Sequence, residues 1–165
     1  MEFASINRKY CLGGKEYTES ALFEYTPDGN QRIQIISKDS SGKILFSTPT
    51  IVQQNKNKDY IVCETTKIVA VSSDGNLRWE YSDYTTRMED FRPFAFCCDN
   101  FSNVIVADFD NGIIDILSRE GKFVSTILTQ RDGIVKPYAL SVDEDDYLWI
   151  GSSLKKEIMI FRYLG

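Results

Sequence analysis

The sequence predicts an all-β chain, a β-propeller built from four-stranded antiparallel blades. Two series of turn residues recur at a constant spacing. The prolines stand 44 residues apart, at Pro49, Pro93 and Pro137. The glycines that close acidic turns stand 46 residues apart, at Gly29, Gly75 and Gly121. No stretch places apolar residues at helical spacing, so we expect each period to be one blade.

The repeat that begins at Pro93 shows the expected strands most plainly. Its strands are expected at 94–98, 104–107, 113–117 and 122–127. Polar turns separate them at 99–103, 108–112 and Glu120-Gly121. Continuous apolar runs of this length are typical of strands buried on both faces. The last segment alternates more, which predicts an outer strand with one wetter face.

The repeats divide the chain into four expected segments. These are a partial first blade at 1–47, blades at 48–90 and 91–135, and a final blade at 136–165. In the first segment, 21–25 and 31–36 would form the outer pair of strands, and 9–12 is only a weak candidate for an inner one. The final blade would lack its outermost strand. The total is an incomplete arc of about three and a half blades of a six-bladed ring.

An open arc leaves strand edges unpaired, and propellers normally protect their edges by closing. Three arrangements would provide this protection. The chain belongs to a longer propeller, its N-terminal residues complete the final blade of a four-bladed ring, or two copies associate. The longer propeller is favoured because six-bladed rings with about 45 residues in each blade are a familiar outcome of such repeats.

Composition limits the possible chemistry. The 165 residues include 19 basic and 24 acidic side chains and no histidine, with a net charge of -5. Catalytic systems in which histidine is the base for a serine or cysteine nucleophile therefore lack that base here. Metal sites with histidine ligands are excluded for the same reason. The acidic segments 108–112 and 143–146 are expected to be turns, because the first departs from a calcium loop in its glycine position and in having Arg119 at the chelating glutamate. We expect no catalysis, cofactor or metal.

Cysteine usage and hydropathy point to the cytoplasm. Cys11, Cys63, Cys97 and Cys98 show no C-x-x-C spacing, which favours free thiols in a reducing compartment. The N-terminal residues lack the basic start and apolar core of a signal peptide. No apolar run is long enough to cross a membrane, so no membrane partner is expected.

The order of polar residues in the repeat from Pro93 carries a family resemblance. Asp99 opens a turn, Val106-Ala107-Asp108 ends a strand, Asn111 stands in the next loop, and Gly121-Lys122-Phe123 forms a later turn. This order resembles the NHL repeat. The repeat from Pro137 is similar through Val142-Asp143, 148–151 and 158–161. The repeat from Pro49 departs from the pattern: Asn55 and Glu64 replace two aspartates, and the loop asparagine is missing.

The resemblance covers about residues 20–165 and implies a recognition surface. The end of the chain is similar to the close of six-bladed NHL propellers in tripartite-motif proteins, where a RING, B-box and coiled coil carry ubiquitin-ligase activity. A RING needs clustered zinc ligands, which four scattered cysteines do not supply. The chain would then be the substrate-recognition end of such a ligase. Some six-bladed propellers are lactonases or lyases with a central metal, and a propeller hydrolase or lyase is a minor alternative.

In this fold the loops that enter the blades and the loops between second and third strands share one face. The expected partner-binding residues on that face are Arg92, Phe94, Phe109, Arg131, Lys136 and Tyr138. Exposed aromatic side chains commonly anchor protein interfaces, so a protein partner is favoured. Of the two tryptophans, we expect Trp149 in the core and Trp79 over a neighbouring blade.

Single-stranded RNA is the alternative ligand, because the same face mixes basic and aromatic side chains. This interpretation adds Arg87, Asp108, Lys155 and Lys156 to the face. The acidic balance of the chain, with a pI near 4.8, opposes it, since phosphate binding requires a positive footprint. DNA is not expected as a partner.

Overall fold

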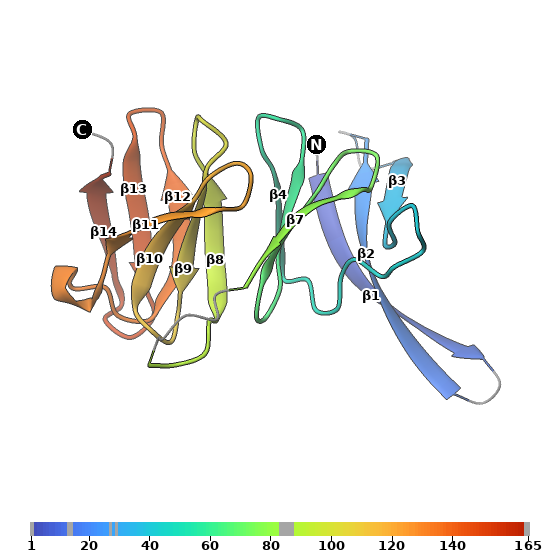
Figure 1. The fold of residues 1–165 in the computed structure, drawn as a ribbon, viewed down its shortest axis with the longest axis horizontal. Helices are drawn as coiled ribbons and strands as arrows, with labels where there is room; N and C mark the ends of the chain where they lie inside the picture. Colours follow the sequence, from blue (N-terminus) through green and yellow to red (C-terminus); the bar gives the residue numbers. More distant parts are fainter. Residues whose placement is uncertain (1, 13–14, 27, 29, 83–87, 164–165) are drawn as a thin grey trace.

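The chain folds into antiparallel sheets that follow one another in sequence order, which confirms the predicted all-β, propeller-type fold (Figure 1). The structure is a computed structural model that describes residues 2–12, 15–26, 28, 30–82 and 88–163. Side chains are described from residue 20 onward, apart from 32–35 and the same gaps.

Four sheets make up the described part. The first contains β1 (Glu2–Leu12), β2 (Lys15–Tyr25) and β3 (Arg32–Ile36). The second contains β4 (Ile51–Gln54), β5 (Tyr60–Cys63), β6 (Ile68–Val71) and β7 (Leu77–Tyr81). The third contains β8 (Pro93–Cys98), β9 (Val104–Asp108), β10 (Ile113–Leu117) and β11 (Phe123–Leu128). The fourth contains β12 (Pro137–Val142), β13 (Tyr147–Ser152) and β14 (Glu157–Arg162), and a 3₁₀ helix, η1 (Gln130–Asp132), precedes it.

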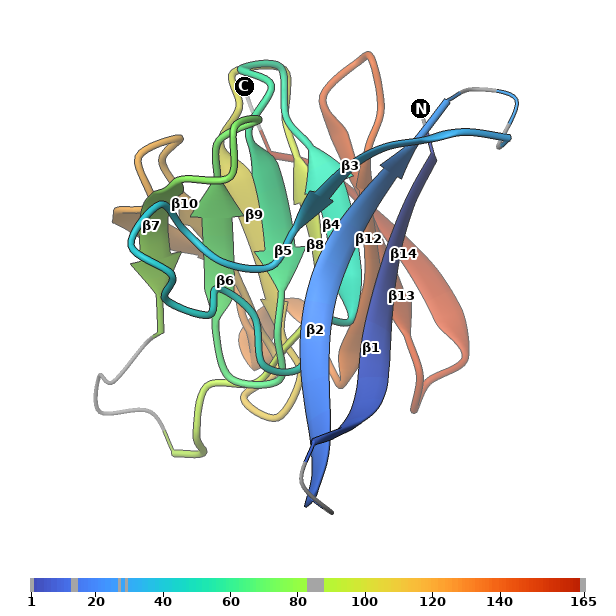
Figure 2. The same ribbon diagram turned by 90° about the vertical axis from the view of Figure 1, so that its right-hand side faces the viewer.

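The sheets stand side by side in a row, from the first (blue) to the fourth (red) (Figure 1). The leading strands of neighbouring sheets contact each other, β1 with β4, β4 with β8 and β8 with β12. Figure 2 looks along the row from the first sheet, with β2 and β1 in front. The sheets therefore form an arc of blades whose leading strands lie along one side.

Apolar faces of neighbouring sheets pack together to form the core. Strands β5, β6 and β9 are buried along their whole length, as their continuous apolar runs predict. The second sheet contributes Ile61, Cys63, Ile68 and Ala70 to its interface with the third. The third sheet contributes Phe96, Val104, Val106 and Leu117 to the same interface. Similar apolar clusters fill the spaces on either side of these two sheets.

The first sheet differs from the expected outer pair. It has a long leading strand, β1, which pairs with β2 from Glu2↔Tyr25 to Leu12↔Lys15. After β3, a short hairpin bridges Lys38 to Ile44 and brings Leu45 and Phe46 into the core. The turn of this hairpin has Gly42 at a φ of 85°, as Gly75 has in the second sheet. The hairpin in 37–46 was thus not predicted by the repeat pattern. Gly29, the glycine expected to close the acidic turn of the first repeat, lies outside the described residues.

The turn after each leading strand explains the 44-residue period. Asn55, Asp99 and Asp143 each accept backbone N–H bonds from the residues two and four positions later, at 2.8–3.0 Å. The residue three positions later has a positive φ in all three turns, at Lys58, Ser102 and Asp146. An amide oxygen accepts the same bonds as a carboxylate, so Asn55 preserves the turn although it departs from the NHL pattern.

Trp79 covers the neighbouring blade, as expected. Its Nε1 donates to the Arg119 carbonyl at 2.9 Å, so the outer strand of the second sheet touches the last turn of the third. The indole lies against Gly121, where a Cβ atom would overlap the ring. Glycine is needed here for its φ of 76° and also for this close approach.

The expectation for Trp149 was wrong. Its side chain is 40% exposed on β13, and its Nε1 donates to Asp143 Oδ2 at 2.9 Å. The run 147–150 alternates in the structure, with Leu148 and Ile150 buried and Tyr147 and Trp149 outward. Only one face of the fourth sheet is covered by another described sheet, so a continuous apolar run does not mean burial on both faces.

Gly121→Ala tests the contact between the blades. Gly42 provides a matched control because it has a similar φ of 85°, and no atom lies within 4 Å of the place that an added Cβ would take. Gly42→Ala should cost about 1 kcal/mol of unfolding free energy from backbone strain. Gly121→Ala should cost about 1–3 kcal/mol more because the methyl group displaces the Trp79 ring. Equal losses in urea denaturation would show that Trp79 does not pack there.

Candidate functional site

Two aromatic rings meet on the face formed by the turn between β9 and β10. The Phe109 amide donates to the Arg92 carbonyl at 3.0 Å, which ties this turn to the segment entering β8. Phe94 stands near the start of β8, and its ring centroid lies 4.9 Å from that of Phe109, with planes tilted by 30°. The Phe94 side chain is 42% exposed. Phe109 is half-buried, so the exposed apolar surface here is mainly that of Phe94.

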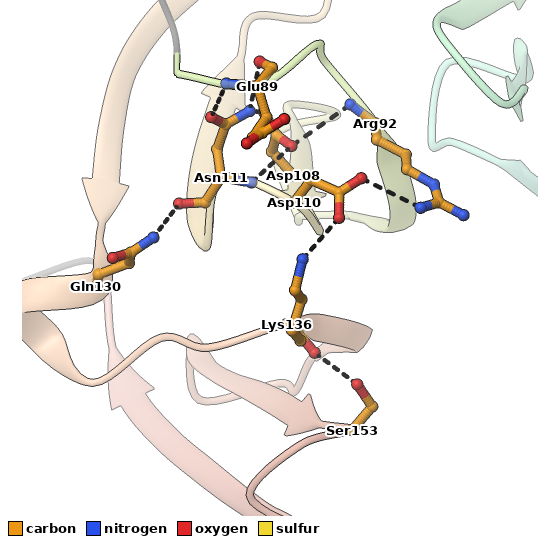
Figure 3. A network of polar contacts seen from close by, with 8 residues as sticks. All are labelled: Glu89, Arg92, Asp108, Asp110, Asn111, Gln130, Lys136 and Ser153. Atoms are coloured by element: carbon orange, nitrogen blue, oxygen red, sulfur yellow. Dashed lines mark hydrogen bonds and ion pairs between the residues drawn. The ribbon is translucent and has the colours of Figure 1, made fainter.

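Two cations and one carboxylate surround the rings. The Arg92 guanidinium carbon lies 5.6 Å from the Phe109 ring centroid, and Lys136 Nζ lies 4.8 Å from it. Asp110 joins the cations, accepting from Lys136 Nζ at 2.7 Å and from Arg92 Nη1 at 3.1 Å (Figure 3). We call Arg92, Phe94, Phe109, Asp110 and Lys136 the aromatic-basic cluster.

The cluster spans two blades. Lys136 belongs to the segment that leads into β12, whereas the other four residues belong to the third sheet and its turns. Lys136 has a backbone φ of 45°, and its carbonyl accepts a hydrogen bond from the Ser153 amide at 3.2 Å. Hydrogen bonds to Lys136, and secondarily to Arg92, hold the pKa of Asp110 below its ordinary value. Asp110 is consequently ionised at neutral pH and fixes both cations.

A polar network centred on the buried side chains of Asp108 and Asn111 holds the cluster in place (Figure 3). Asn111 Nδ2 donates to Asp108 Oδ2 at 2.9 Å and to the Glu89 carbonyl at 3.0 Å, while its Oδ1 accepts the Glu89 amide at 3.1 Å. Asp108 is fully buried and accepts the Arg92 amide at 3.4 Å. Gln130 Nε2 donates to the Asn111 carbonyl at 3.0 Å. The network fastens the entering segment to the end of β9.

The same position performs the same task in the neighbouring blades. Glu64, the residue that departs from the NHL aspartate, is buried and accepts the amides of Ser47 and Thr48. Ser152 donates its hydroxyl to the Val135 carbonyl at 2.7 Å. Each polar side chain at the end of a second strand therefore holds the segment that enters its own blade.

The structure brings together four of the six expected binding residues: Arg92, Phe94, Phe109 and Lys136. Arg131 lies in η1 instead and lines a cleft of about 670 Å³ that shares only Asp110 with the cluster. That cleft is lined by Met88, Glu89, Asp110, Asn111, Ile113, Thr129, Gln130 and Arg131. Tyr138 is exposed on β12, and its ring lies beside Gly151. Arg87 lies outside the described residues.

Asp110 and a small cleft were missed by sequence reasoning. The pattern around Asp110 predicts only a turn, and the two cations facing it come from positions 18 and 26 residues away. The cleft, of about 190 Å³, lies between the second and third sheets beside Phe94. Its lining consists of Thr50, Ile51, Thr65, Arg92, Pro93 and Phe94. The residues that form these ion pairs and this cleft are far apart in the sequence. Their proximity can be seen only when the sheets are placed side by side.

The described cysteines are free thiols, as expected for Cys63, Cys97 and Cys98. Burial raises the pKa of the Cys63 thiol to about 11 and that of Cys98 to about 12. Burial also raises the pKa of Cys97. With these raised pKa values the thiols are protonated at neutral pH. Because the thiolate is the reactive form, they are poor nucleophiles.

The described residues contain neither a candidate metal cluster nor a candidate membrane-spanning helix. Among the described side chains, no three or more histidine, cysteine, aspartate or glutamate residues lie close enough together to hold a metal ion. No helix in the described part is long and apolar enough to cross a membrane.

Similarity to solved structures is confined to the fold. No family model matches the chain, and no curated protein is significantly similar to it in sequence. A structure of virginiamycin B lyase from Staphylococcus aureus matches 86% of this chain with a TM-score of 0.54 and 14% identity. Another, of the inactive enzyme with quinupristin, matches 98% with a TM-score of 0.61 and 13% identity. The extracellular domain of BT3049 from B. thetaiotaomicron matches 85% with a TM-score of 0.55 and 14% identity.

These matches establish a propeller-type fold. The chain covers 48% and 59% of the two lyase chains and 20% of the BT3049 chain, so it spans about half the length of the lyases and a smaller part of BT3049. At 13–14% identity, the similarity does not extend to the function of those proteins. The NHL repeat is likewise not established by it.

Lys136→Met tests the central ion pair. Removal of the ammonium should raise the pKa of Asp110 toward its ordinary value, because the largest interaction that favours the carboxylate is lost. The lowered pKa means that the pair stabilises the fold above the ordinary pKa of aspartate, and that this stabilisation is lost as pH falls through the lowered value. Carbon-13 NMR titration measures the shift. Lys155→Met is the control, since Lys155 contacts Gly133 and Glu157, and an unchanged Asp110 in both variants would contradict the geometry.

Proposed function

We propose that the chain is a non-enzymatic recognition module that binds a protein partner through the aromatic-basic cluster. The observation that carries this proposal is the exposed Phe94 ring packed on the half-buried Phe109 ring, which has two cations beside it. Aromatic and arginine side chains are the residues that most often anchor protein interfaces. The adjacent cleft of about 190 Å³ beside Phe94 has room for one apolar side chain of the partner.

The charge of the surface supports a protein over a nucleic acid. Arg92 and Lys136 are both paired with Asp110, so the cluster retains one net positive charge rather than two. The whole chain is acidic, with a net charge of -5. Nucleic-acid binding depends on neutralising several phosphates, which requires a larger positive surface. A peptide with an apolar anchor and an acidic neighbour fits the cluster better.

Single-stranded RNA is the second candidate. The observation that favours it is an aromatic ring, Phe109, with two cations beside it, because bases stack on aromatic rings and on guanidinium planes. The face would bind only one or two nucleotides in this way, since Arg131 and Tyr138 are not part of the cluster.

The wider context is part of the proposal. A recognition module that resembles the NHL repeat would select substrates for a tripartite-motif ubiquitin ligase in the cytoplasm, where free thiols remain reduced. The fold is shared with a lyase, but protonated thiols and the absence of histidine from the sequence favour binding over catalysis.

The test compares ligands of the Phe94→Ala/Phe109→Ala variant with those of Phe101→Ala. Phe101 is 66% exposed in the turn between β8 and β9, away from the cluster, and serves as the matched control. Quantitative pull-down should show one set of proteins that the double variant loses and the control keeps, with binding weakened about 30-fold or more for two anchors. Equal retention by both variants would reject the cluster as the binding site.

A parallel titration uses a fluorescein-labelled oligouridine at low salt. We expect no binding by the wild-type chain. Binding that weakens steeply with salt and disappears in Arg92→Glu/Lys136→Glu would replace the protein proposal with the RNA one. Thermal unfolding of every variant shows whether the rings serve only to pack the blades together.

A further inference from the structure

The larger cleft lies beside the aromatic-basic cluster and is formed by the third blade and its loops. Its residues come from the segment that enters the blade (Met88 and Glu89), the turn between β9 and β10, the start of β10, and the loop that carries η1. The third sheet has all four of its strands. The volume of about 670 Å³ falls within the range of ligand-binding pockets, about 300–1,000 Å³. The cleft is therefore large enough to hold several residues of a bound chain.

The buried Asn111 forms the floor of the cleft between two walls. Its side chain holds the backbone of Glu89, and its carbonyl accepts a hydrogen bond from Gln130 Nε2 at 3.0 Å. Figure 3 shows Asn111 between Glu89 and Gln130. Arg131 follows Gln130 in η1. Glu89 consequently stands on one wall and Arg131 on the other.

Each wall carries a charged side chain that has no partner among the described residues. Glu89 is bonded only through its backbone, and Arg131 only through its backbone amide, which donates to Thr129 Oγ1 at 3.1 Å. Both side chains are exposed. The carboxylate of Asp110 and the amide of Asn111 are already engaged within the protein. A ligand in the cleft therefore meets one available carboxylate and one available guanidinium.

Asp110 connects the larger cleft with the aromatic-basic cluster. It lines this cleft and accepts from Arg92 Nη1 at 3.1 Å, while Arg92 lines the small cleft beside Phe94. Arg92 and Lys136 have further N–H donors and no acceptor, so a ligand group that passes over them must be a carbonyl or a carboxylate. The small cleft, the cluster and the larger cleft thus form one connected binding surface.

We infer that the partner protein binds here as an extended segment, which continues from the cluster through the larger cleft with a basic side chain against Glu89 and an acidic side chain against Arg131. The inference rests on the proposed function. Successive side chains of an extended segment point to opposite sides, so neighbouring residues of the segment meet opposite walls. The aliphatic stem of the basic residue lies along Met88 and Ile113. Complementary charges at the two walls would select the partner and fix the register of its segment.

Selection from a phage-displayed library of random linear peptides tests the inference. Peptides enriched on the wild-type chain should contain adjacent basic and acidic residues beyond the part that binds the cluster. Glu89→Lys should select an acidic residue in place of the basic one, and Arg131→Glu a basic residue in place of the acidic one. Neither substitution removes a side chain that is bonded within the described protein, so thermal unfolding should be unchanged.

Fluorescence anisotropy of an enriched peptide measures the size of the effect. Glu89→Lys should raise its dissociation constant about tenfold or more, because two positive charges then face each other. Exchange of the basic residue of the peptide for glutamate should restore the affinity. Glu144→Lys is the matched control and should bind as the wild-type chain does, since Glu144 is exposed in the turn between β12 and β13 and lines neither cleft.

The methyl resonance of Met88 shows whether the peptide enters the larger cleft. Met88 is 97% exposed where it lines the cleft, whereas Met159 packs between the third and fourth sheets. In a chain with carbon-13-labelled methionine methyl groups, the enriched peptide should shift the Met88 resonance and leave that of Met159 in place.

The outcomes separate this inference from the proposed function. Peptides that require Phe94 and Phe109 but whose charges do not follow the substitutions at Glu89 and Arg131 overturn the inference and leave the proposed function standing. A bound peptide that leaves Met88 unshifted does the same. If the wild-type chain enriches no peptide that the Phe94→Ala/Phe109→Ala variant loses, the proposed function fails and the inference fails with it.

Discussion

The structure depends on the packing of one apolar sheet face against the next. Each sheet has two apolar faces in its central strands, so no sheet could be stable in water without a neighbour. Ile61 and Ile68 on one sheet and Val106 and Leu117 on the next show how the faces meet, with every one of them fully buried. This requirement sets the row of sheets, and the row then places all second-to-third-strand turns along one edge.

The polar residue at the end of each second strand converts this packing into a defined surface. Asp108, Glu64 and Ser152 differ in chemistry, but each holds the segment that enters its blade. In the third blade this bond fixes Arg92, and the neighbouring blade supplies Lys136. The aromatic-basic cluster exists because the two blades are held in register, so its geometry is a consequence of the interface and of the buried network together.

Sequence reasoning predicted what local chemistry determines. The apolar run 104–107 became β9, and the spacing of 44 residues reflects the turns at Asn55, Asp99 and Asp143. The juxtaposition of Phe94 with Phe109 followed from the shared face of the loops. The sequence does not show whether a given face of a sheet is covered by another sheet, so the exposure of Trp149 was not predicted.

Other misses have equally physical reasons. The first repeat contains two short acidic segments with a glycine, 28–31 and 39–43, and the sequence of 2–12 has no strong period that would show which of them ends the blade. Arg131 was expected on the binding face from its position in a loop, but the 3₁₀ turn η1 with its Thr129 cap places it in the lining of the larger cleft, which reaches the cluster only at Asp110. The part played by Asp110 depends on an ion pair across blades, which no local pattern encodes.

Methyl NOE spectroscopy of a chain with labelled isoleucine, leucine and valine tests the face-to-face packing most directly. Packing of the second sheet on the third requires NOEs that connect the methyl groups of Ile61 and Ile68 with those of Val104, Val106 and Leu117. A spectrum in which the first two methyls show contacts only within their own sheet would contradict the arrangement of blades, and with it the positions of both proposed surfaces.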